Sequence, residues 1–361
     1  MHSTSSAVDA NPTTLLNVQA MRAVAALLVV VGHTLALSSI NLPEYLGGGL
    51  IHTFAYAGVD IFFVISGLVI CTAAQKHLVQ SAQVSNLQLS LSFLVRRLFR
   101  IYPLYWTVFL VIFCCTKGLN IDFIENNFQT LLKNFWLVNK YNDVVPQAWS
   151  LAFEMYFYAS MACILFFFRA RYFVCLLIWF LLPFAWYATE FLPTGYVRDI
   201  ILDPMLLEFL FGCVVFFLIR RESLYLPVLV LFVGLILFFI GAYQTLQQGL
   251  LTSSPRTLSF GLGSAFIIYG LIGIEKLKGW CLPKFLVELG DVSYSIYLVH
   301  MGIIVAALAI SRNLGNLHSE YQATFLFLIF LAVLAISWCC HRFIEKPFIA
   351  LGAKLAKRVS A

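Results

Sequence analysis

Residues 15–38 read LLNVQAMRAVAALLVVVGHTLALS, an apolar run long enough to cross a membrane as one helix, yet it contains Arg22 and His33. An ionisable side chain at membrane depth is costly and rare, so each of the two is a candidate functional residue. The step from Arg22 to His33 turns through about 1100° in an α-helix, about 20° beyond three full turns. Both side chains therefore lie on one face, about 16 Å apart along the axis, which suits a long ligand lying along the helix.

The composition extends this conclusion to the whole chain. Of its 361 residues 61% are hydrophobic and only 11% are charged, which is outside the range of soluble globular domains. The nine cysteines show no spacing typical of a metal site or a disulfide framework, so we expect no metal. The net charge of +6 is spread over short loops, which indicates cytoplasmic loops of a membrane protein and not a partner that is a nucleic acid.

Windows of about 20 apolar residues predict ten transmembrane helices. They cover residues 15–38, 54–74, 98–115, 149–168, 172–188, 199–219, 224–243, 258–274, 288–310 and 323–343. The expected fold is therefore an all-α, polytopic membrane helix bundle in contact with the lipid bilayer. Within it we expect a disordered cytoplasmic tail at 1–14, one membrane domain at 15–347 and a basic cytoplasmic tail at 348–361.

The basic residues predict the orientation of the bundle. If the N-terminus is cytoplasmic, 16 of the 23 Lys and Arg residues lie on the inner side, six lie on the outer side, and Arg22 lies within the membrane. This distribution favours two cytoplasmic termini and places Arg256 in an outer loop. Residues 76–97 are expected to form a polar inner loop. Residues 117–148 are expected to form an outer loop whose apolar residues recur at the spacing of an interfacial amphipathic helix.

Five motifs in order resemble the acyltransferase type 3 family, with the step from Arg22 to His33 as the first. The others are GVDIFFVISG (58–67), RRLFRIYPLYW (96–106), WSLAFEMYFY (149–158) and LGDVSYSIYLVH (289–300), followed by a closing EKP (345–347). The resemblance spans nearly the whole chain and is greatest to exopolysaccharide O-acetyltransferases. It implies a multi-pass inner-membrane enzyme that moves an acyl group from acetyl-coenzyme A, or another acyl-coenzyme A, to a glycan or lipid-linked glycan.

His33 is the leading candidate for a general base, because imidazole titrates near neutrality and could take a proton from a sugar hydroxyl. The alternative is a histidine that is simply hydrogen-bonded inside the bundle. Glu154 shares a helix face with Ser150 and Tyr158, and its estimated depth in the membrane nearly equals that of His33. We therefore predict that Glu154 orients His33 as its catalytic partner. A purely structural carboxylate is the alternative.

Three arginines are predicted to bind the donor. Arg97 and Arg100 open the predicted third helix at the inner surface, and Arg22 lies somewhat deeper. Guanidinium groups bind phosphate in a bidentate manner, so these three side chains could receive the phosphates of coenzyme A. For Arg97 the general excess of cytoplasmic arginine is an alternative explanation, whereas Arg22 is too deep for it.

Further polar residues are expected to line the substrate path or pore. They are Asp60, Ser66, Ser150, Tyr158, Tyr297 and His300. Asp60 is also explained as a structural residue that pairs with Arg22 or another cation. Gly67 would let helices approach closely. The EKP motif is expected to end the last helix, and neither its Glu345 nor the nearby His341 is given a catalytic role.

The predicted function is that of an O-acyltransferase, in first place an O-acetyltransferase. The alternative is a transporter or flippase for a glycan or lipid-linked glycan, because intramembrane charged residues also mark substrate pathways. A scaffold that only binds is disfavoured by the many titratable groups at membrane depth. The acceptor, the acyl length, direct transfer against an acyl-enzyme, and the formation of a homo-oligomer are left open.

Overall fold

The computed structural model describes residues 15–38, 53–80, 84–118, 127–187, 197–220, 224–249, 253–313 and 321–360. All regular structure in these residues is helical, which confirms the predicted all-α class. Nine segments of this part are long and apolar enough to cross a membrane. The predicted helices at 149–168 and 172–188 fall together in one of them, Pro146–Leu181. The predicted tail at 1–14 lies outside the described residues.

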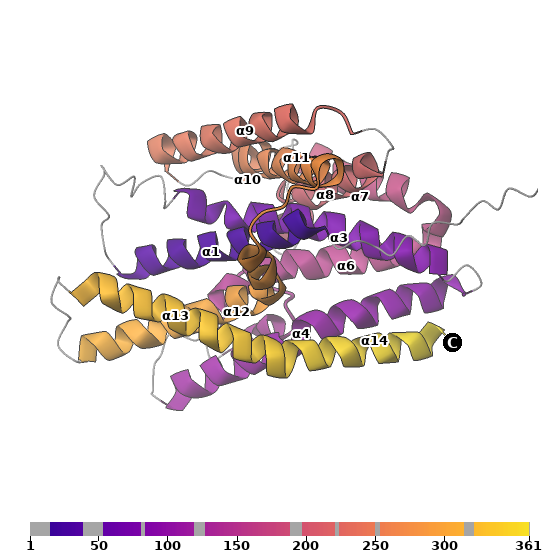
Figure 1. Ribbon diagram of the computed structural model, residues 1–361. Helices are drawn as coiled ribbons and strands as arrows, with labels where there is room; N and C mark the ends of the chain where they lie inside the picture. The colour runs from indigo at the N-terminus through magenta and orange to yellow at the C-terminus, as the bar shows by residue number, and fades with distance from the viewer. Residues whose placement is uncertain are drawn as a thin grey trace, which may run out of the picture.

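The main helices follow one another along the chain. They are α1 (Leu16–Ser38), α3 (Gly58–Gln80), α4 (Asn86–Gly118), α5 (Phe128–Phe135), α6 (Trp149–Phe168), α7 (Tyr172–Tyr187), α8 (Leu206–Ile219), α9 (Pro227–Gln248), α10 (Ser253–Arg256), α11 (Leu262–Lys278), α12 (Lys284–Asn313), α13 (Gln322–Cys340) and α14 (Lys346–Ser360). In Figure 1, α1, α3 and α6 lie in the middle, with α8, α9 and α11 above them and α4, α12, α13 and α14 below. The contacts agree, because α1 packs on α12, α3 on α8, α9 on α11 and α4 on α14.

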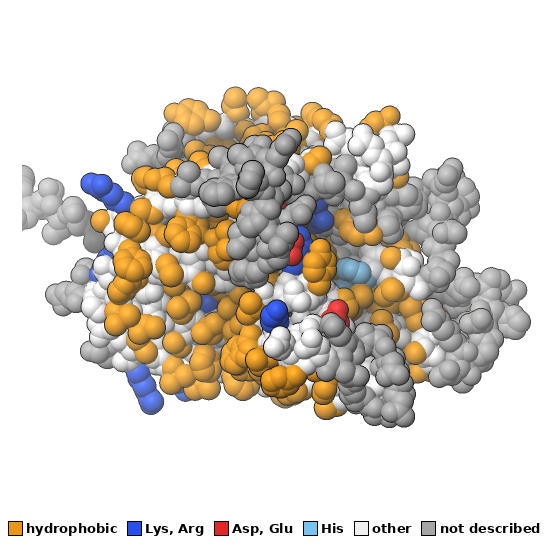
Figure 2. Space-filling model, turned by 180° about the vertical axis from the view of Figure 1, so that it is seen from behind, with side chains coloured by type: hydrophobic (Ala, Val, Ile, Leu, Met, Phe, Trp, Pro, Cys, Tyr) orange, Lys and Arg blue, Asp and Glu red, His pale blue; other side chains and the backbone are white. Residues whose placement is uncertain are grey.

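Hydrophobic side chains form the outer surface of this bundle. Phe232 and Phe239 of α9 and Phe327 and Leu328 of α13 are each more than half exposed. Figure 2 shows such side chains over much of the described part of one face, with Lys and Arg mainly toward the end at which α14 finishes. A large exposed apolar surface marks a site of contact with lipid or protein. With the long apolar helices, it identifies a multi-pass membrane protein.

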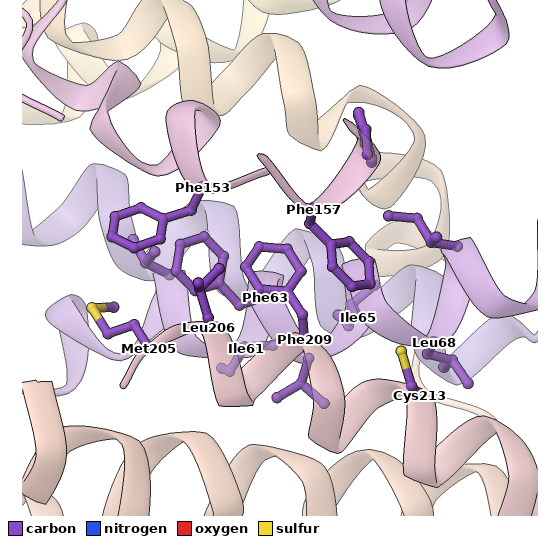
Figure 3. Packing of buried hydrophobic residues seen from close by; sticks show 14 of the residues in the cluster. Ile61, Phe63, Ile65, Leu68, Phe153, Phe157, Met205, Leu206, Phe209 and Cys213 are labelled. Carbon is purple, nitrogen blue, oxygen red and sulfur yellow. The ribbon is translucent and has the colours of Figure 1, made fainter. Parts of the chain in front are cut away.

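Aromatic side chains fill the contact between α3, α6 and α8. The ring of Phe63 in α3 stacks on that of Phe209 in α8 at a centre distance of 4.5 Å, and the ring of Phe157 in α6 lies 4.7 Å from the ring of Phe209 (Figure 3). All three side chains are buried. Because lipid is as apolar as a protein core, close packing of this kind stabilises the association of helices in a membrane.

Two glycines let α3 and α8 cross at short range. A Cβ atom at Gly67 would lie 1.9 Å from the carbonyl oxygen of Phe209, and one at Gly212 would lie 1.9 Å from that of Val64. Non-bonded atoms do not approach to such distances, so any side chain at either position would push the two backbones apart. The expectation that Gly67 allows a close approach of helices is confirmed.

Gly67→Ala is therefore expected to destabilise the protein by about 1–3 kcal/mol, the usual cost of adding a methyl group to a well-packed contact. Thermal unfolding in detergent, followed by the loss of monodisperse protein, measures the effect. Gly302→Ala is the matched control, because its Cβ would lie 3.6 Å from Ile112, an ordinary contact distance. Equal unfolding midpoints for the two variants would contradict the prediction.

The first half of α4 corrects the loop predicted at residues 76–97, because the helix already begins at Asn86. Leu89 and Phe93, one turn apart, are buried in the bundle. The hydroxyl of Ser90 donates a hydrogen bond of 2.8 Å to a backbone carbonyl of α6. Ser90 is thus one of the polar residues that indicated a loop, yet it is buried and hydrogen-bonded inside the bundle. The polarity of such a residue does not indicate a loop.

The chain also continues as a helix where the EKP motif was expected to end it. The π-helical turn His341–Glu345 joins α13 to α14. In this turn the N–H of Lys346 bonds to the carbonyl of His341, five residues back. The wider turn accommodates Pro347, which has no N–H to donate. Most of the predicted basic tail at 348–361 is accordingly a helix that packs along α4 (Figure 1).

The amphipathic helix predicted within residues 117–148 is confirmed as α5, although part of the predicted pattern lies outside the described residues. Phe128 is largely exposed, whereas Asn134 is buried. The hydroxyl of Tyr105 in α4 donates to the carbonyl of Asn134 at 2.5 Å, and the indole N–H of Trp106 donates to the next carbonyl at 3.0 Å. Side chains of α4 thus satisfy the last backbone groups of α5.

Candidate functional site

A cavity lies between α1, α3, α4, α6 and α12. We call it the arginine cavity. Its lining includes eight residues that the sequence indicated as functional: Arg22, Ser66, Arg97, Arg100, Ser150, Glu154, Tyr158 and Tyr297. The arginines of α4 reach it because they lie inside this long helix. The prediction that Arg97 and Arg100 open a helix is wrong, because α4 begins at Asn86.

Aromatic rings surround the guanidinium group of Arg97. Its central carbon lies 5.6 Å from the ring centre of Phe93 and 5.8 Å from that of Tyr158. Its Nε atom is buried and has no hydrogen-bond partner among the described residues. Leaving a buried donor unpaired costs about 1–3 kcal/mol. A ligand oxygen at this position would remove that cost.

Glu154 lies in the arginine cavity. Its carboxylate accepts hydrogen bonds from the hydroxyl of Ser66, at 3.3 Å, and from the hydroxyl of Tyr158 one turn further along α6. It also acts electrostatically on Arg22. His33 lines a different cavity, so the predicted pairing of Glu154 with His33 is wrong. Equal depth in the membrane gives the height of a residue but not the side of the helix on which it lies.

The second cavity lies between α1, α3, α6, α9 and the segment around α10. We call it the histidine cavity, because His33 lines it. Its wall also contains Tyr56, Trp149 and Arg256. Val59 of α3 lines both cavities, which are therefore direct neighbours.

His33 is paired with His300 of α12. The Nδ1 atom of His33 lies 3.0 Å from the carbonyl oxygen of Val29 and 3.2 Å from Nε2 of His300, whose own Nδ1 lies 2.6 Å from the carbonyl oxygen of Tyr297. Carbonyl oxygens only accept, so both Nδ1 atoms carry protons. Neutral His300 then accepts from His33 through Nε2. This pattern assigns the lone pair of neutral His33 to its Nε2 atom, which is the basic position.

Tyr297 connects the two cavities through α12. Its hydroxyl donates to the carbonyl of Gln147 at 2.5 Å, so the hydroxyl of Ser150, 2.6 Å away, donates to Tyr297. Tyr297 lines the arginine cavity, while its carbonyl oxygen accepts the hydrogen bond from His300, which is fully buried. His300 thus contacts His33, whereas it was expected to line the substrate path.

Asp60 is fully buried and binds Arg256, which lines the histidine cavity. The Nε and Nη2 atoms of Arg256 donate to the carboxylate of Asp60 over 2.8 to 3.2 Å, and Nη2 also donates to the carbonyl of Tyr56 at 2.9 Å. The placement of Arg256 in an outer loop is wrong, because it belongs to the candidate span Ser254–Lys278. The expected pairing of Asp60 with a cation is confirmed, and this cation is Arg256 and not Arg22.

Comparison with known proteins adds an independent finding. A family model described as an acyltransferase domain matches residues 15–342. The chain is 28% identical over 327 residues to the exopolysaccharide production protein ExoZ of Rhizobium meliloti (strain 1021), which covers 86% of this chain and 93% of that protein. No solved structure matches the chain significantly. Because the family model covers most of the sequence, the chain belongs to the acyltransferase 3 family of membrane proteins.

Proposed function

We propose that this membrane protein is an O-acyltransferase, in first place an O-acetyltransferase, that acts on a sugar hydroxyl of an exported or cell-surface glycan. The family match supports an acyltransferase, and the similarity to an exopolysaccharide production protein supports a glycan acceptor. The observation that carries the proposal is the pair of neighbouring cavities. One is lined by three arginines and the other by a histidine, and Val59 lies between them.

The arginine cavity is the proposed site of the donor, acetyl-coenzyme A or another acyl-coenzyme A. Guanidinium groups bind phosphate through paired hydrogen bonds, and coenzyme A carries several phosphate oxygens. Arg22, Arg97 and Arg100 line one cavity although they come from two helices. The unpaired Nε atom of Arg97 supports an anionic ligand at this position.

The histidine cavity is the proposed site of the acceptor. Trp149 and Tyr56 provide flat, partly polar surfaces of the kind on which sugar rings pack. His33 acts as the general base through Nε2 and takes the proton of the sugar hydroxyl while the hydroxyl oxygen attacks the thioester carbon. The carbon–sulfur bond then breaks, and the thiolate of coenzyme A leaves and receives a proton. His300 fixes the ring of His33 by accepting, through its Nε2 atom, a hydrogen bond from Nδ1 of His33.

The proposed location is the plasma (inner) membrane, with the donor entering from the cytoplasm. The Lys and Arg side chains gather mainly toward one end of the bundle (Figure 2), as expected for a cytoplasmic end. α14, which finishes at this end, carries Lys354, Lys357 and Arg358. We propose that the donor reaches the arginine cavity from this side.

Mass spectrometry of surface glycans from cells with and without the intact gene tests the proposed function. We expect the intact gene to add a mass that matches one acetyl group per modified sugar. Purified protein in vesicles should then transfer labelled acetyl from acetyl-coenzyme A to the same glycan. Loss of whole glycan units from the surface, without a change in acetyl content, would contradict the enzyme and support a flippase.

A further inference from the structure

The two cavities follow each other along the length of the helices. On α1, Arg22 lines the arginine cavity, and His33, about 16 Å further along the helix axis, lines the histidine cavity. On α6 the order is reversed, because its first residue, Trp149, lines the histidine cavity and Glu154 lines the arginine cavity. Each of these helices passes from one cavity to the other. The cavities are therefore stacked along the bundle, and a donor bound in one has to reach lengthwise into the other.

Val59 lies where the lining on the side of α3 changes from one cavity to the other. Ala55 and Tyr56, in the helical turn before α3, line the histidine cavity. Phe62 and Phe63, one turn after Val59, line the arginine cavity. Residues three and four apart share a helix face, so these side chains follow one another along one face. Among the described residues, Val59 is the one that lines both cavities.

Close packing fixes the backbone at Val59. A Cβ atom at Gly58, the residue before it, would lie 2.5 Å from the carbonyl oxygen of Ala25 and 2.8 Å from a methyl carbon of Val29, so α1 and α3 cross here at short range. Val29 also lines the histidine cavity, and its carbonyl oxygen lies 3.0 Å from Nδ1 of His33. Val59 itself is buried, with 7% of its surface exposed. The helix contact thus fixes Val59 relative to the helix that carries His33.

Aromatic rings hold the two phenylalanines that follow Val59. The ring of Phe62 lies 5.7 Å from that of Tyr297 in α12, and the ring of Phe63 lies 6.2 Å from that of Trp149 in α6, both edge to face. Trp149 lines the histidine cavity, so its contact with Phe63 belongs to the same boundary. The boundary on this side is apolar. A phosphate group that crossed it would lose its polar partners, whereas a thioester with a short acyl chain carries no charge.

We propose that Val59 sets the length of the acyl group that the protein accepts, because the acyl end of the donor passes this residue on its way from the arginine cavity to His33. The inference rests on the donor and acceptor sites proposed above. The phosphates of the donor stay with the arginines, and the acyl group packs against the two methyl groups of Val59. This side chain leaves room for an acetyl group, and further methylene groups meet it. The donor class is thus short-chain acyl-coenzyme A.

The size of the side chain at position 59 should therefore control the acyl preference. One methylene group more or less in a closely packed apolar site changes discrimination about 10- to 200-fold. Val59→Ala removes two methyl groups and should admit a butyryl chain, which is two methylene groups longer than acetyl. Val59→Ile adds one carbon atom and should hinder even the acetyl group. The two variants thus change the preference in opposite directions.

Titration calorimetry of the full-length protein in detergent with coenzyme A, acetyl-coenzyme A and butyryl-coenzyme A measures these preferences. We expect the wild-type protein to bind butyryl-coenzyme A at least about 10-fold more weakly than acetyl-coenzyme A. Val59→Ala should bring these two Kd values close together. Val59→Ile should raise the Kd of acetyl-coenzyme A about 10-fold and leave that of coenzyme A, which has no acyl group, unchanged.

Val64→Ala is the matched control. Val64 lies in α3 as Val59 does, is fully buried, and lines neither of the two cavities. Its replacement by alanine removes the same two methyl groups from the same helix, so it reports the general effect of a smaller buried side chain. Val64→Ala should keep the wild-type ratio of the Kd values for butyryl-coenzyme A and acetyl-coenzyme A.

The outcomes separate the inference from the proposed function. A wild-type ratio of the two Kd values in Val59→Ala, or the same change of this ratio in Val64→Ala, would overturn the role of Val59 and leave the donor site intact. If Val59→Ala does not fold, unchanged binding of acetyl-coenzyme A by Val59→Ile would overturn it. A wild-type protein without saturable binding of coenzyme A or acetyl-coenzyme A would contradict the proposed donor site itself.

Discussion

Replacing His33 with alanine should lower the rate of acyl transfer by about 10²–10⁴-fold, the usual contribution of a positioned general base. The reason is the loss of the Nε2 lone pair that would take the proton of the sugar hydroxyl. The affinity for acetyl-coenzyme A and the amount of folded protein should not change, because His33 lies in the histidine cavity and not in the arginine cavity. Initial rates in reconstituted vesicles measure the loss.

Thr34→Val is the control for this prediction. Thr34 is the next residue of α1, and its hydroxyl donates to the carbonyl of Val30 within the same helix at 2.7 Å. Its replacement removes a polar group of similar depth without removing a base, so transfer should continue at nearly the wild-type rate. Wild-type transfer by His33→Ala would remove His33 from the mechanism.

The face of α1 could be predicted from the sequence because helix periodicity is a local property. Eleven residues bring Arg22 and His33 to the same side of any regular α-helix. The structure agrees, since the two side chains line neighbouring cavities that share Val59. The same local reasoning correctly placed Glu154 and Tyr158 together, one turn apart in α6.

The partner of His33 could not be predicted in this way. It depends on which helix packs beside α1, and this is a property of the assembled bundle. The contact between α1 and α12 is made possible by Gly290, which meets the backbone of Gln19, 271 positions earlier, and no periodicity connects such distant segments. Depth estimates favoured Glu154, whereas the packing of helices selected His300.

Arg256 shows a second limit of the sequence. Counting basic residues on each side of a membrane treats every arginine near a helix end as a loop residue. A usable signal was nevertheless present, because a carboxylate such as Asp60 in the middle of an apolar helix requires a cation. The sequence indicated that such a cation exists but not that Arg256, 196 positions later, provides it.

The ion pair of Asp60 and Arg256 has a third member. Glu208 of α8 is fully buried, acts electrostatically on both residues, and has an Oε2 atom without a hydrogen-bond partner among the described residues. Two carboxyl groups and one guanidinium group are balanced when one carboxyl carries a proton, and a proton on Oε2 of Glu208 would remove the repulsion from Asp60. Glu208 can therefore lose its proton and supply a negative charge if Asp60 is removed.

We expect Arg256→Met to destabilise the protein by about 3–5 kcal/mol, because it leaves a buried carboxylate without a cation. Asp60→Asn should cost less, since Glu208 can ionise and pair with Arg256 in its place. The double variant Asp60→Asn/Arg256→Met should be more stable than Arg256→Met alone, because it removes the unpaired charge. Unfolding by denaturant in mixed micelles measures the order of the three variants.

Lys284→Met is the control, because its pair with Glu288 spans 3.6 Å at an exposed surface and should contribute about 0.5 kcal/mol or less. A cost for Arg256→Met no larger than that of Lys284→Met would show that water reaches the pair through the histidine cavity, and a larger cost for Asp60→Asn than for Arg256→Met would show that Glu208 does not replace Asp60.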